Sequence, residues 1–341
     1  MIAYRGAGEA CIAAQHQPAL VLDYARSRDA DGVHLLRDTG LDASDIPAAG
    51  RAVSPLQYAQ LIRNVLRELD SADTSFMLGQ QMLPGHYGEI SHALLHAQTL
   101  RQALQILCEF ASRLCPLLRP RWREEGALAA VYWMDSFGLP ALRPALVEMH
   151  MTALVAMCRW LSGERLPWRF CFNRASPRHT EQHQVHLGQE LRFDCHLDAM
   201  LIDAAWLDRP WPRGSAMAAS VALRAVELEA ARAPLLPGLL DALYDFLLER
   251  VRGAPTLELT AAAFDVSPAT LKRHLLRHGS HFQAELDQVR THVAIYLFQT
   301  RRADNDTVAA YLGFHDATNF RRSFKRWTGQ TPGLLRDALH V

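Results

Sequence analysis

Hydrophobic residues in the first two thirds of the chain follow two different periods. Most recur every three or four residues, which places them on one face of a helix, and Ser54-Pro55 supplies a capped start for one such segment. Two other runs read as strands joined by a turn through Glu124, Glu125 and Gly126. The predicted helices cover residues 18–28, 31–39, 54–69, 99–114, 141–161 and 215–232, and the predicted strands cover 117–123, 127–134, 168–172 and 199–203. This pattern predicts an α+β domain.

After Gly238 the hydrophobic spacing is helical throughout. The chain is broken by prolines and glycines just before this point, so we place the domain boundary between residues 234 and 235. The predicted domains are therefore 1–234 and 235–341. In the second domain Ser267-Pro268 and Asp316-Ala317 provide helix caps, and Gly279, Gly313 and Gly329 stand where helices should end. An all-α domain is expected here.

Two helix-turn-helix units, at about 257–278 and 306–328, stand out within this second domain. Each has a short helix, a tight turn and a capped second helix, which is the arrangement of a DNA-reading unit. The long helix predicted for residues 280–299 joins them. A spacer of that length suits two reading helices held about 34 Å apart, one turn of DNA.

The second helix of each unit separates into an apolar and a polar face. In the first unit Leu271 and Leu275 are predicted to point inward. In the second unit Phe320, Phe324 and Trp327 are predicted to be buried. The residues left on the two outer faces are Ala269, Lys272 and Arg273, and then Arg321, Arg322, Lys325 and Arg326. A basic helix face on its own is as often a plain solvent-exposed surface as a DNA-binding one. Two helix-turn-helix units with clear caps and stops, joined by a spacer helix, favour DNA binding.

Overall charge gives little support to a nucleic-acid partner. The chain has 36 Lys+Arg and 36 Asp+Glu, a formal net charge of zero, whereas DNA-binding domains are often basic. From Leu235 onward there are 13 basic and 11 acidic residues, a net charge of +2, which leaves −2 for the rest. The only two lysines, Lys272 and Lys325, both lie on the predicted reading helices. The placement of charge is therefore more informative than its sum.

Cysteines and histidines are the residues of this chain that could hold a metal or sense redox state. The six cysteines contain no C-x-x-C pair, so we expect reduced thiols, with redox or metal sensing as the alternative. No apolar stretch is long enough to span a membrane and no secretory leader is recognisable, so a cytoplasmic protein is expected. A conspicuous group comprises His179, His183, His186, Cys195 and His196, but its spacing matches no closed metal site. We therefore expect neither a metal nor another cofactor.

The stretch from Tyr311 to Pro332, YLGFHDATNFRRSFKRWTGQTP, closely resembles the signature of the AraC/XylS family of transcription regulators. The likeness covers about the last hundred residues. It implies two helix-turn-helix subdomains in one monomer, bound to an asymmetric DNA site. By this resemblance the base-facing residues are Ala269, Lys272 and Arg273 of the first reading helix and Thr318, Arg321 and Arg322 of the second, with Lys325 and Arg326 as further DNA-binding candidates.

The first turn departs from the family pattern. Where the family commonly has glycine, this chain has Asp265 between Phe264 and Val266. Aspartate adopts a left-handed backbone more readily than most residues, so we expect the turn to be kept. Ala269 is too small to read a base edge by hydrogen bonding, which leaves Lys272 and Arg273 as the discriminating residues of this helix.

Residues from Pro18 to Asp208 resemble, less sharply, the sensor domain of the ornithine-utilisation-regulator branch of that family. The segments that carry this resemblance are Arg51–Ser54, Leu78–Gln80, Gly85–Gly88, Thr99–Leu104 and Leu191–Phe193. It implies a domain that responds to a small-molecule effector, whose identity does not carry over. Candidate effector-binding residues are Tyr87, Tyr132, Trp133 and Trp160, although an ordinary core role is the alternative for each.

The sequence thus predicts an effector-responsive, sequence-specific transcription regulator. Its expected partners are promoter DNA, an unidentified small molecule, RNA polymerase and a second copy of the chain, with the helices of residues 215–251 as the dimer face. The alternative is a constitutive DNA-binding protein whose N-terminal domain serves only dimerisation. An enzyme is not expected, because no G-x-S-x-G, P-loop or dinucleotide fingerprint is present.

Overall fold

The computed structural model describes residues 1–48, 50–232 and 236–333. The chain divides into two compact units. One unit consists of Arg5–Leu236 and the other of Pro237–Val341 together with Met1–Tyr4. The boundary expected from the sequence falls within residues 233–235, outside the described residues. None of the described helices is long and apolar enough to span a membrane.

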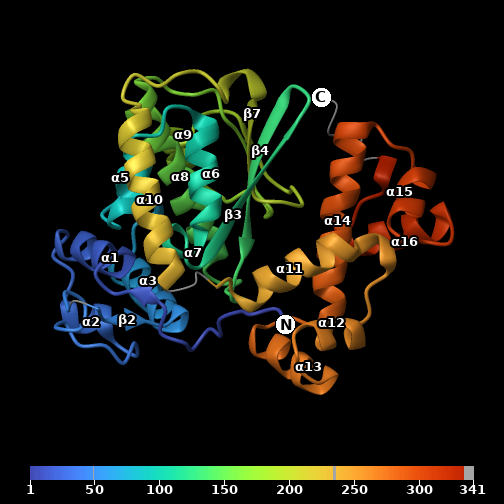
Figure 1. The fold of residues 1–341 in the computed structure, drawn as a ribbon, viewed down its shortest axis with the longest axis horizontal. Coiled ribbons are helices and arrows are strands. Elements are labelled where there is room, and N and C mark those ends of the chain that lie inside the picture. Colours follow the sequence, from blue (N-terminus) through green and yellow to red (C-terminus); the bar gives the residue numbers. More distant parts are fainter. Residues whose placement is uncertain (49, 233–235, 334–341) are drawn as a thin grey trace. The chain divides into compact units, whose positions relative to one another are not determined.

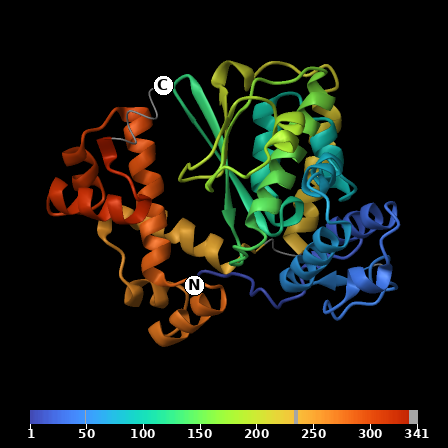
Figure 2. The ribbon, with the colours of Figure 1, turned by 180° about the vertical axis from the view of Figure 1, so that it is seen from behind.

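A five-stranded sheet organises the larger unit. The strand order is β3-β4-β7-β5-β6, antiparallel except for the parallel pair β5 and β6. The strands are β3 (Leu118–Glu125), β4 (Leu128–Asp135), β5 (Arg169–Cys171), β6 (Leu191–Arg192) and β7 (Ala199–Asp203), and a separate pair is formed by β1 (Ile12–Ala13) and β2 (Ala52–Val53). Figures 1 and 2 show helices α5, α6, α8 and α10 gathered on one side of this sheet. The unit is the mixed α and β domain that the sequence predicted.

The β3–β4 hairpin turns later than expected. Glu125 pairs with Leu128, so the connection is Gly126-Ala127, and Glu124 and Glu125 belong to the strand. Gly126 has φ +56°, a left-handed backbone that glycine adopts without a Cβ penalty. The position of the tight turn is therefore set by the glycine, not by the two polar residues before it.

The six helices predicted for this unit are present, one of them divided in two, and α4, α5 and α9 are helices that the sequence did not predict. They are α1 (Gln17–Arg26), α2 (Gly32–Leu36), α3 (Pro55–Leu69), α4 (Thr74–Met82), α5 (Glu89–Leu95), α6 (Leu100–Glu109), α7 (Ala111–Leu114), α8 (Arg143–Ser162), α9 (Glu181–His186) and α10 (Ala216–Arg232), with a 3₁₀ turn at Ala204–Trp206. The single helix expected over 99–114 is divided at Phe110, whose backbone leaves the helical region while its side chain is buried. Burial of this large ring overrides the local helical preference.

Two local features fix how the helices of the larger unit begin and pack. Ser54 caps α3, with its hydroxyl accepting from Gln57 N while the Gln57 side chain accepts from Ser54 N. Gly79 in α4 lies against α8 so closely that a Cβ there would stand 2.4 Å from the carbonyl oxygen of Met149. Only glycine permits this approach of the two helices.

The smaller unit is helical and is built around one long helix. Its elements are α11 (Leu239–Arg250), α12 (Leu257–Ala263), α13 (Pro268–Arg277), α14 (Phe282–Arg301), α15 (Asn305–Tyr311) and α16 (Ala317–Thr328), with a 3₁₀ turn at Val251–Gly253. Helix α14 packs against α11, α15 and α16. In Figure 1, α13 lies near one end of α14, while α15 and α16 lie along its other half. The two helix-turn-helix units predicted from the sequence are α12–α13 and α15–α16.

The first four residues of the chain pack on the first helix-turn-helix unit. The backbone N of Ile2 donates to the carbonyl oxygen of Ala263 at 2.9 Å. Tyr4 places its ring 5.7 Å from that of Phe264, and its Oη lies 2.9 Å from Nδ1 of His274 on α13. These residues fall within the predicted domain 1–234, and nothing in their local pattern indicates so distant a contact.

Asp265 adopts the left-handed backbone that the sequence predicted for the first turn. Its φ is +55°, and the matching position of the second unit is Gly313 with φ +73°. The backbone N of Asp265 donates to Ala262 O, which closes the turn. The turn therefore has the same form in both units despite the missing glycine.

Asp265→Val is expected to loosen α12 and α13, because a β-branched residue in the left-handed region costs about 1–2 kcal/mol. Asp265→Gly should leave the turn as stable as in the wild type or make it more stable. Hydrogen exchange of the α12 and α13 amides in the full-length protein measures the difference. Ala262→Val, at an exposed helical position, is the control and should change protection only slightly. Equal loss of protection in the Val and Gly variants would show that the backbone conformation is not what Asp265 contributes.

Candidate nucleic-acid interface

Helix α13 is held so that one side is buried and the other is free. Ser267 caps it, accepting from Thr270 N at 3.1 Å, and Pro268 occupies the first turn, where its missing N–H costs nothing. Leu271 and Leu275 have no exposed surface. The predicted base-facing residues of this helix, Ala269, Lys272 and Arg273, are all exposed.

Helix α16 has the same construction with aromatic anchors. Phe320 and Phe324 are fully buried and contact Phe298 of α14, with ring centroids 6.1 Å and 5.9 Å away. Trp327 was expected to be buried as well but is only half-buried, with its ring 5.8 Å from Phe314. The outward residues Thr318, Arg321, Arg322, Lys325 and Arg326 are all exposed.

Helix α16 starts with a charge-assisted cap. The Asp316 carboxylate accepts from the backbone N of Asn319 at 2.6 Å. This bond, with smaller contributions from His315 and Thr318, lowers the pKa of Asp316. The carboxylate therefore stays ionised, which suits its place at the positive end of the helix dipole.

The exposed cations of the two reading helices differ in how free they are. Lys272, Arg273, Arg322 and Lys325 make no ion pair with any residue that the structure describes. Arg326 differs, since its Nη2 lies 3.7 Å from a carboxylate oxygen of Asp287 on α14. A guanidinium engaged by a carboxylate has less charge to offer a phosphate, so Arg326 is less available for a polyanion than these other cations.

Helix α14 sets the spacing between the two reading helices. Its 20 residues span about 30 Å, close to one turn of B-DNA. Arg290, near its middle, is half-buried with its guanidinium 5.3 Å from the ring centre of Phe314. Burial lowers the pKa of Arg290, and Asp287 opposes that shift. Arg290 thus serves packing between α14 and the second unit and is not part of the exposed basic face.

The four candidate effector-binding residues of the larger unit do not form one group. Tyr87 is buried and donates to the carbonyl oxygen of Met82 at 2.7 Å, and Trp160 is 45% exposed with the Arg213 guanidinium 4.8 Å from its ring centre. Tyr132 and Trp133 are consecutive on β4 and so point to opposite faces of the sheet. Trp133 is distinctive because its Nε1 is buried with no hydrogen-bond partner among the described residues.

Histidines of the segment 179–196 interact with polar side chains of the larger unit. Buried His183 lies with Nε2 3.1 Å from Oε1 of Glu148, which also accepts from Ser75 and Arg174. Burial raises the pKa of Glu148, but these hydrogen bonds and the Arg174 charge outweigh it and the pKa is lowered. His186 interacts instead with Gln80. Among the described residues no three His, Cys, Asp or Glu side chains are grouped to hold a metal ion.

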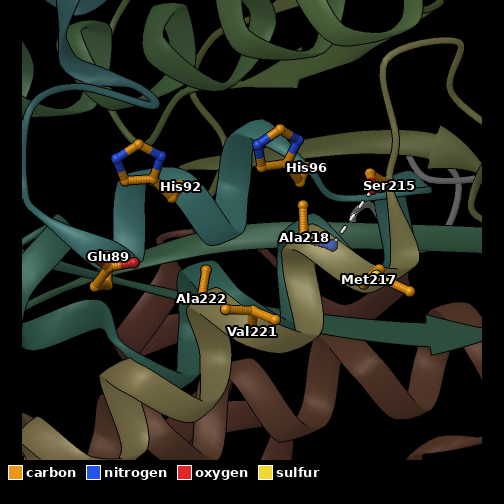
Figure 3. A pocket seen from close by; sticks show the side chains of 8 residues that line it. All are labelled: Glu89, His92, His96, Ser215, Met217, Ala218, Val221 and Ala222. Carbon is orange, nitrogen blue, oxygen red and sulfur yellow. Dashed lines mark hydrogen bonds between the residues drawn. The ribbon is translucent and has the colours of Figure 1, made fainter.

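A shallow groove lies between α5 and α10 in the larger unit (Figure 3). Its volume is about 460 Å³. His92 of α5 and His96, directly after α5, border it opposite Val221 and Ala222 of α10. The wall that α10 contributes to the groove is apolar and exposed, with Met217 80% and Val221 64% exposed. No sequence pattern predicted this groove.

Comparison with known families matches both parts of the chain. A family described as the arabinose-binding domain of AraC transcription regulators, N-terminal, matches residues 30–211, which is more than half of the chain. A helix-turn-helix domain family matches residues 260–338, which include both reading helices.

Similar individual proteins are also transcription regulators by name. The ornithine utilization regulator of Pseudomonas aeruginosa is 27% identical over 322 residues, which are 94% of this chain and 93% of that protein. An uncharacterized HTH-type transcriptional regulator of Mycobacterium tuberculosis is 23% identical over 335 residues, 92% of this chain and 93% of its own. The crystal structure of the transcriptional regulator CdpR from Pseudomonas aeruginosa matches with a TM-score of 0.42 and 21% identity, over 81% of this chain and 90% of that one.

Arg322→Ala is expected to weaken binding to a specific DNA site more than binding to random DNA. An arginine that contacts a base edge contributes about 1–3 kcal/mol of discrimination, whereas a phosphate contact weakens both kinds of binding alike. Fluorescence anisotropy at fixed salt concentration, with a selected site and a scrambled duplex, separates the two effects. Arg178→Ala, at an exposed position of the other unit, is the control. Equal losses on both duplexes would contradict a base-reading role for Arg322.

Proposed function

This chain belongs to the AraC family of transcription regulators, and from that premise we propose that it contacts an asymmetric promoter site through α13 and α16 under the control of a small-molecule effector. The chain is a DNA-binding regulator with an arabinose-binding-type N-terminal domain. The finer parts of the proposal concern which residues read the DNA, what the effector is and how the protein assembles with its partners.

The observation that carries the DNA proposal is the pair of capped helices with buried apolar and exposed basic faces. Lys272 and Arg273 are available on α13, and Arg322 and Lys325 on α16. Because α14 spans about one turn of DNA, both faces suit successive major grooves on one side of the duplex. Arg321, hydrogen-bonded to Thr318 at 3.2 Å, is a further base-reading candidate, whereas Arg326 suits a phosphate contact.

For the effector we propose a small polar metabolite that contacts the indole N–H of Trp133. A buried donor without a partner is costly, and a ligand acceptor would relieve that cost. Ornithine is the first compound to test, because the relative that spans nearly the whole chain is named for ornithine utilization. Tyr87, Tyr132 and Trp160 remain candidates for the wider binding region.

An effector that controls DNA binding should change the affinity for a selected site by about 5- to 150-fold, the usual range of allosteric coupling. The measurement titrates ornithine, and then a panel of other amino acids and amines, while anisotropy reports DNA affinity. Trp133→Phe keeps the ring and removes the N–H, so it should reduce the response without reducing DNA affinity in the absence of effector.

Trp206→Phe is the matched control, since this half-buried indole lies under Arg209 with the guanidinium 3.6 Å from its ring centre. A response that survives in Trp133→Phe would remove Trp133 from the proposal. The absence of any response to the whole panel would favour the constitutive alternative, in which the N-terminal unit serves only dimerisation.

We further propose that two copies of the chain pair through α10 and that the dimer acts with RNA polymerase at promoters. Met217, Val221 and Leu228 are 80%, 64% and 66% exposed, and their spacings of four and seven residues place them on one stripe. Exposed Arg224, three residues after Val221 and four before Leu228, lies on the stripe itself, and exposed Glu227 lies beside it, so two copies can present complementary charges to each other. Large apolar side chains exposed in a row are typical of an association surface.

The double substitution Met217→Glu and Val221→Glu should convert a dimer into a monomer, because it places like charges in the paired stripe. Light scattering after size-exclusion chromatography measures the mass. Val185→Glu is the control, since Val185 is 68% exposed on α9 and lies off the stripe. A wild-type monomer at every concentration, or a dimer that persists in the double variant, would contradict pairing through α10.

A further inference from the structure

Two cysteines far apart in the sequence meet at the end of the β5–β6 pair. Cys171 is the last residue of β5 and lies opposite Arg192 of β6. The chain then turns at Asp194, which has φ +55° and whose N donates to Arg174 O at 2.8 Å. The backbone N of Cys195 donates to Phe172 O at 3.0 Å. This turn places the Cys195 thiol within hydrogen-bonding reach of the Cys171 thiol.

Neither cysteine of this pair is fully buried. Each cysteine is half-buried, in contrast to fully buried Cys115 and Cys158. The Cys195 Sγ lies 3.7 Å from the carbonyl oxygen of Arg192, in an exposed contact. The hydrogen bond between the two thiols makes their sulfurs neighbours, which is the arrangement that a disulfide needs.

The surroundings give the two thiols different roles. The hydrogen bond from Cys195 lowers the pKa of Cys171, and the positive charges of Arg192 and Arg169 lower it further. Burial and the negative charge of Asp198 act in the opposite direction but do not cancel the decrease. The pKa of Cys195 is raised, first by the hydrogen bond to Cys171 and then by burial. Burial raises the pKa of the other four cysteines, Cys11, Cys108, Cys115 and Cys158. Cys171 is thus the thiol of this chain most disposed to ionise.

A metal is the other ligand that two adjacent thiols attract. A stable protein site for zinc uses three or four such ligands. Within the described part of the chain no third histidine, cysteine or carboxylate joins this pair in a metal-binding group. The pair therefore fits oxidation better than metal binding.

We propose that Cys171 and Cys195 are a peroxide-oxidisable dithiol in the larger unit. The Cys171 thiolate attacks one oxygen of a hydroperoxide, the O–O bond breaks, and the departing alkoxide or hydroxide takes a proton and leaves as an alcohol or water. Cys171 is then a sulfenic acid. The Cys195 sulfur attacks the Cys171 sulfur, an S–S bond forms, the S–O bond breaks, and the hydroxyl leaves with the Cys195 proton as water. The dithiol loses two electrons and the peroxide gains them.

The test treats reduced full-length protein with a small excess of hydrogen peroxide, blocks the remaining thiols and maps the cysteines by mass spectrometry. Trypsin cuts after Arg169, Arg174 and Arg192, so the two cysteines fall on separate peptides. The expected result is the loss of two thiols and one cross-linked pair of peptides, restored by dithiothreitol. Cross-links between other cysteines, or equal oxidation of all six thiols, would overturn the proposal.

Variants separate the two roles. Cys195→Ser should leave Cys171 as a sulfenic acid that dimedone traps, and Cys171→Ser should slow thiol loss on the order of tenfold, because it removes the thiol whose pKa is lowered. Cys108→Ser, at a thiol outside the pair, should oxidise like the wild type. Oxidation of Cys171→Ser at the wild-type rate would refute the assignment. The mapping in the wild-type protein needs no variant and decides the question even where a substitution impairs folding.

Discussion

Burial of one side of each reading helix is the constraint on which the DNA-binding unit depends. In α16, Phe320 and Phe324 are four residues apart and both have no exposed surface. A helix with 3.6 residues per turn must then direct Arg321, Arg322 and Lys325 away from the core. Each buried ring contributes about 1.5–3 kcal/mol, far more than a surface charge gains by reorienting. The packing therefore fixes which side chains are offered to DNA.

Helix α14 links the packing of α16 to the rest of the DNA-binding unit. Its Phe298 contacts both anchors of α16, and α14 also packs against α11 and α15. Asp287 of the same helix engages Arg326, so α14 also modulates the charge of the basic face. A chain with zero net charge can bind a polyanion, because binding depends on the number of unpaired cations on the surface that faces the DNA. With few such cations, we expect non-specific affinity to be modest and more of the binding energy to depend on base contacts.

The features that the sequence predicted well are those whose cause lies within a few residues. Ser54 caps a helix through Gln57, and Asp265 provides a left-handed turn, so both are visible in a short window. The break at Phe110 was missed because it results from burial of the ring in a core assembled from distant segments. The contact of Tyr4 with His274 was missed for the same reason. Local chemistry predicts elements, whereas the contacts between them require the fold.

The same distinction limits what aromatic composition says about the effector region. Tyr132 and Trp133 are adjacent in sequence, yet strand alternation sends them to opposite faces of the sheet, so one pocket cannot use both in the same way. Trp160 is 45% exposed and contacts Arg213. The Tyr87 hydroxyl already donates a hydrogen bond to the carbonyl oxygen of Met82. Trp133 alone of these four combines near-complete burial with an unsatisfied donor. Folding tolerates such a group at a cost of about 1–3 kcal/mol, and a bound acceptor that removes this cost would stabilise the liganded state selectively. That difference between two states is what an effector needs in order to act at a distance.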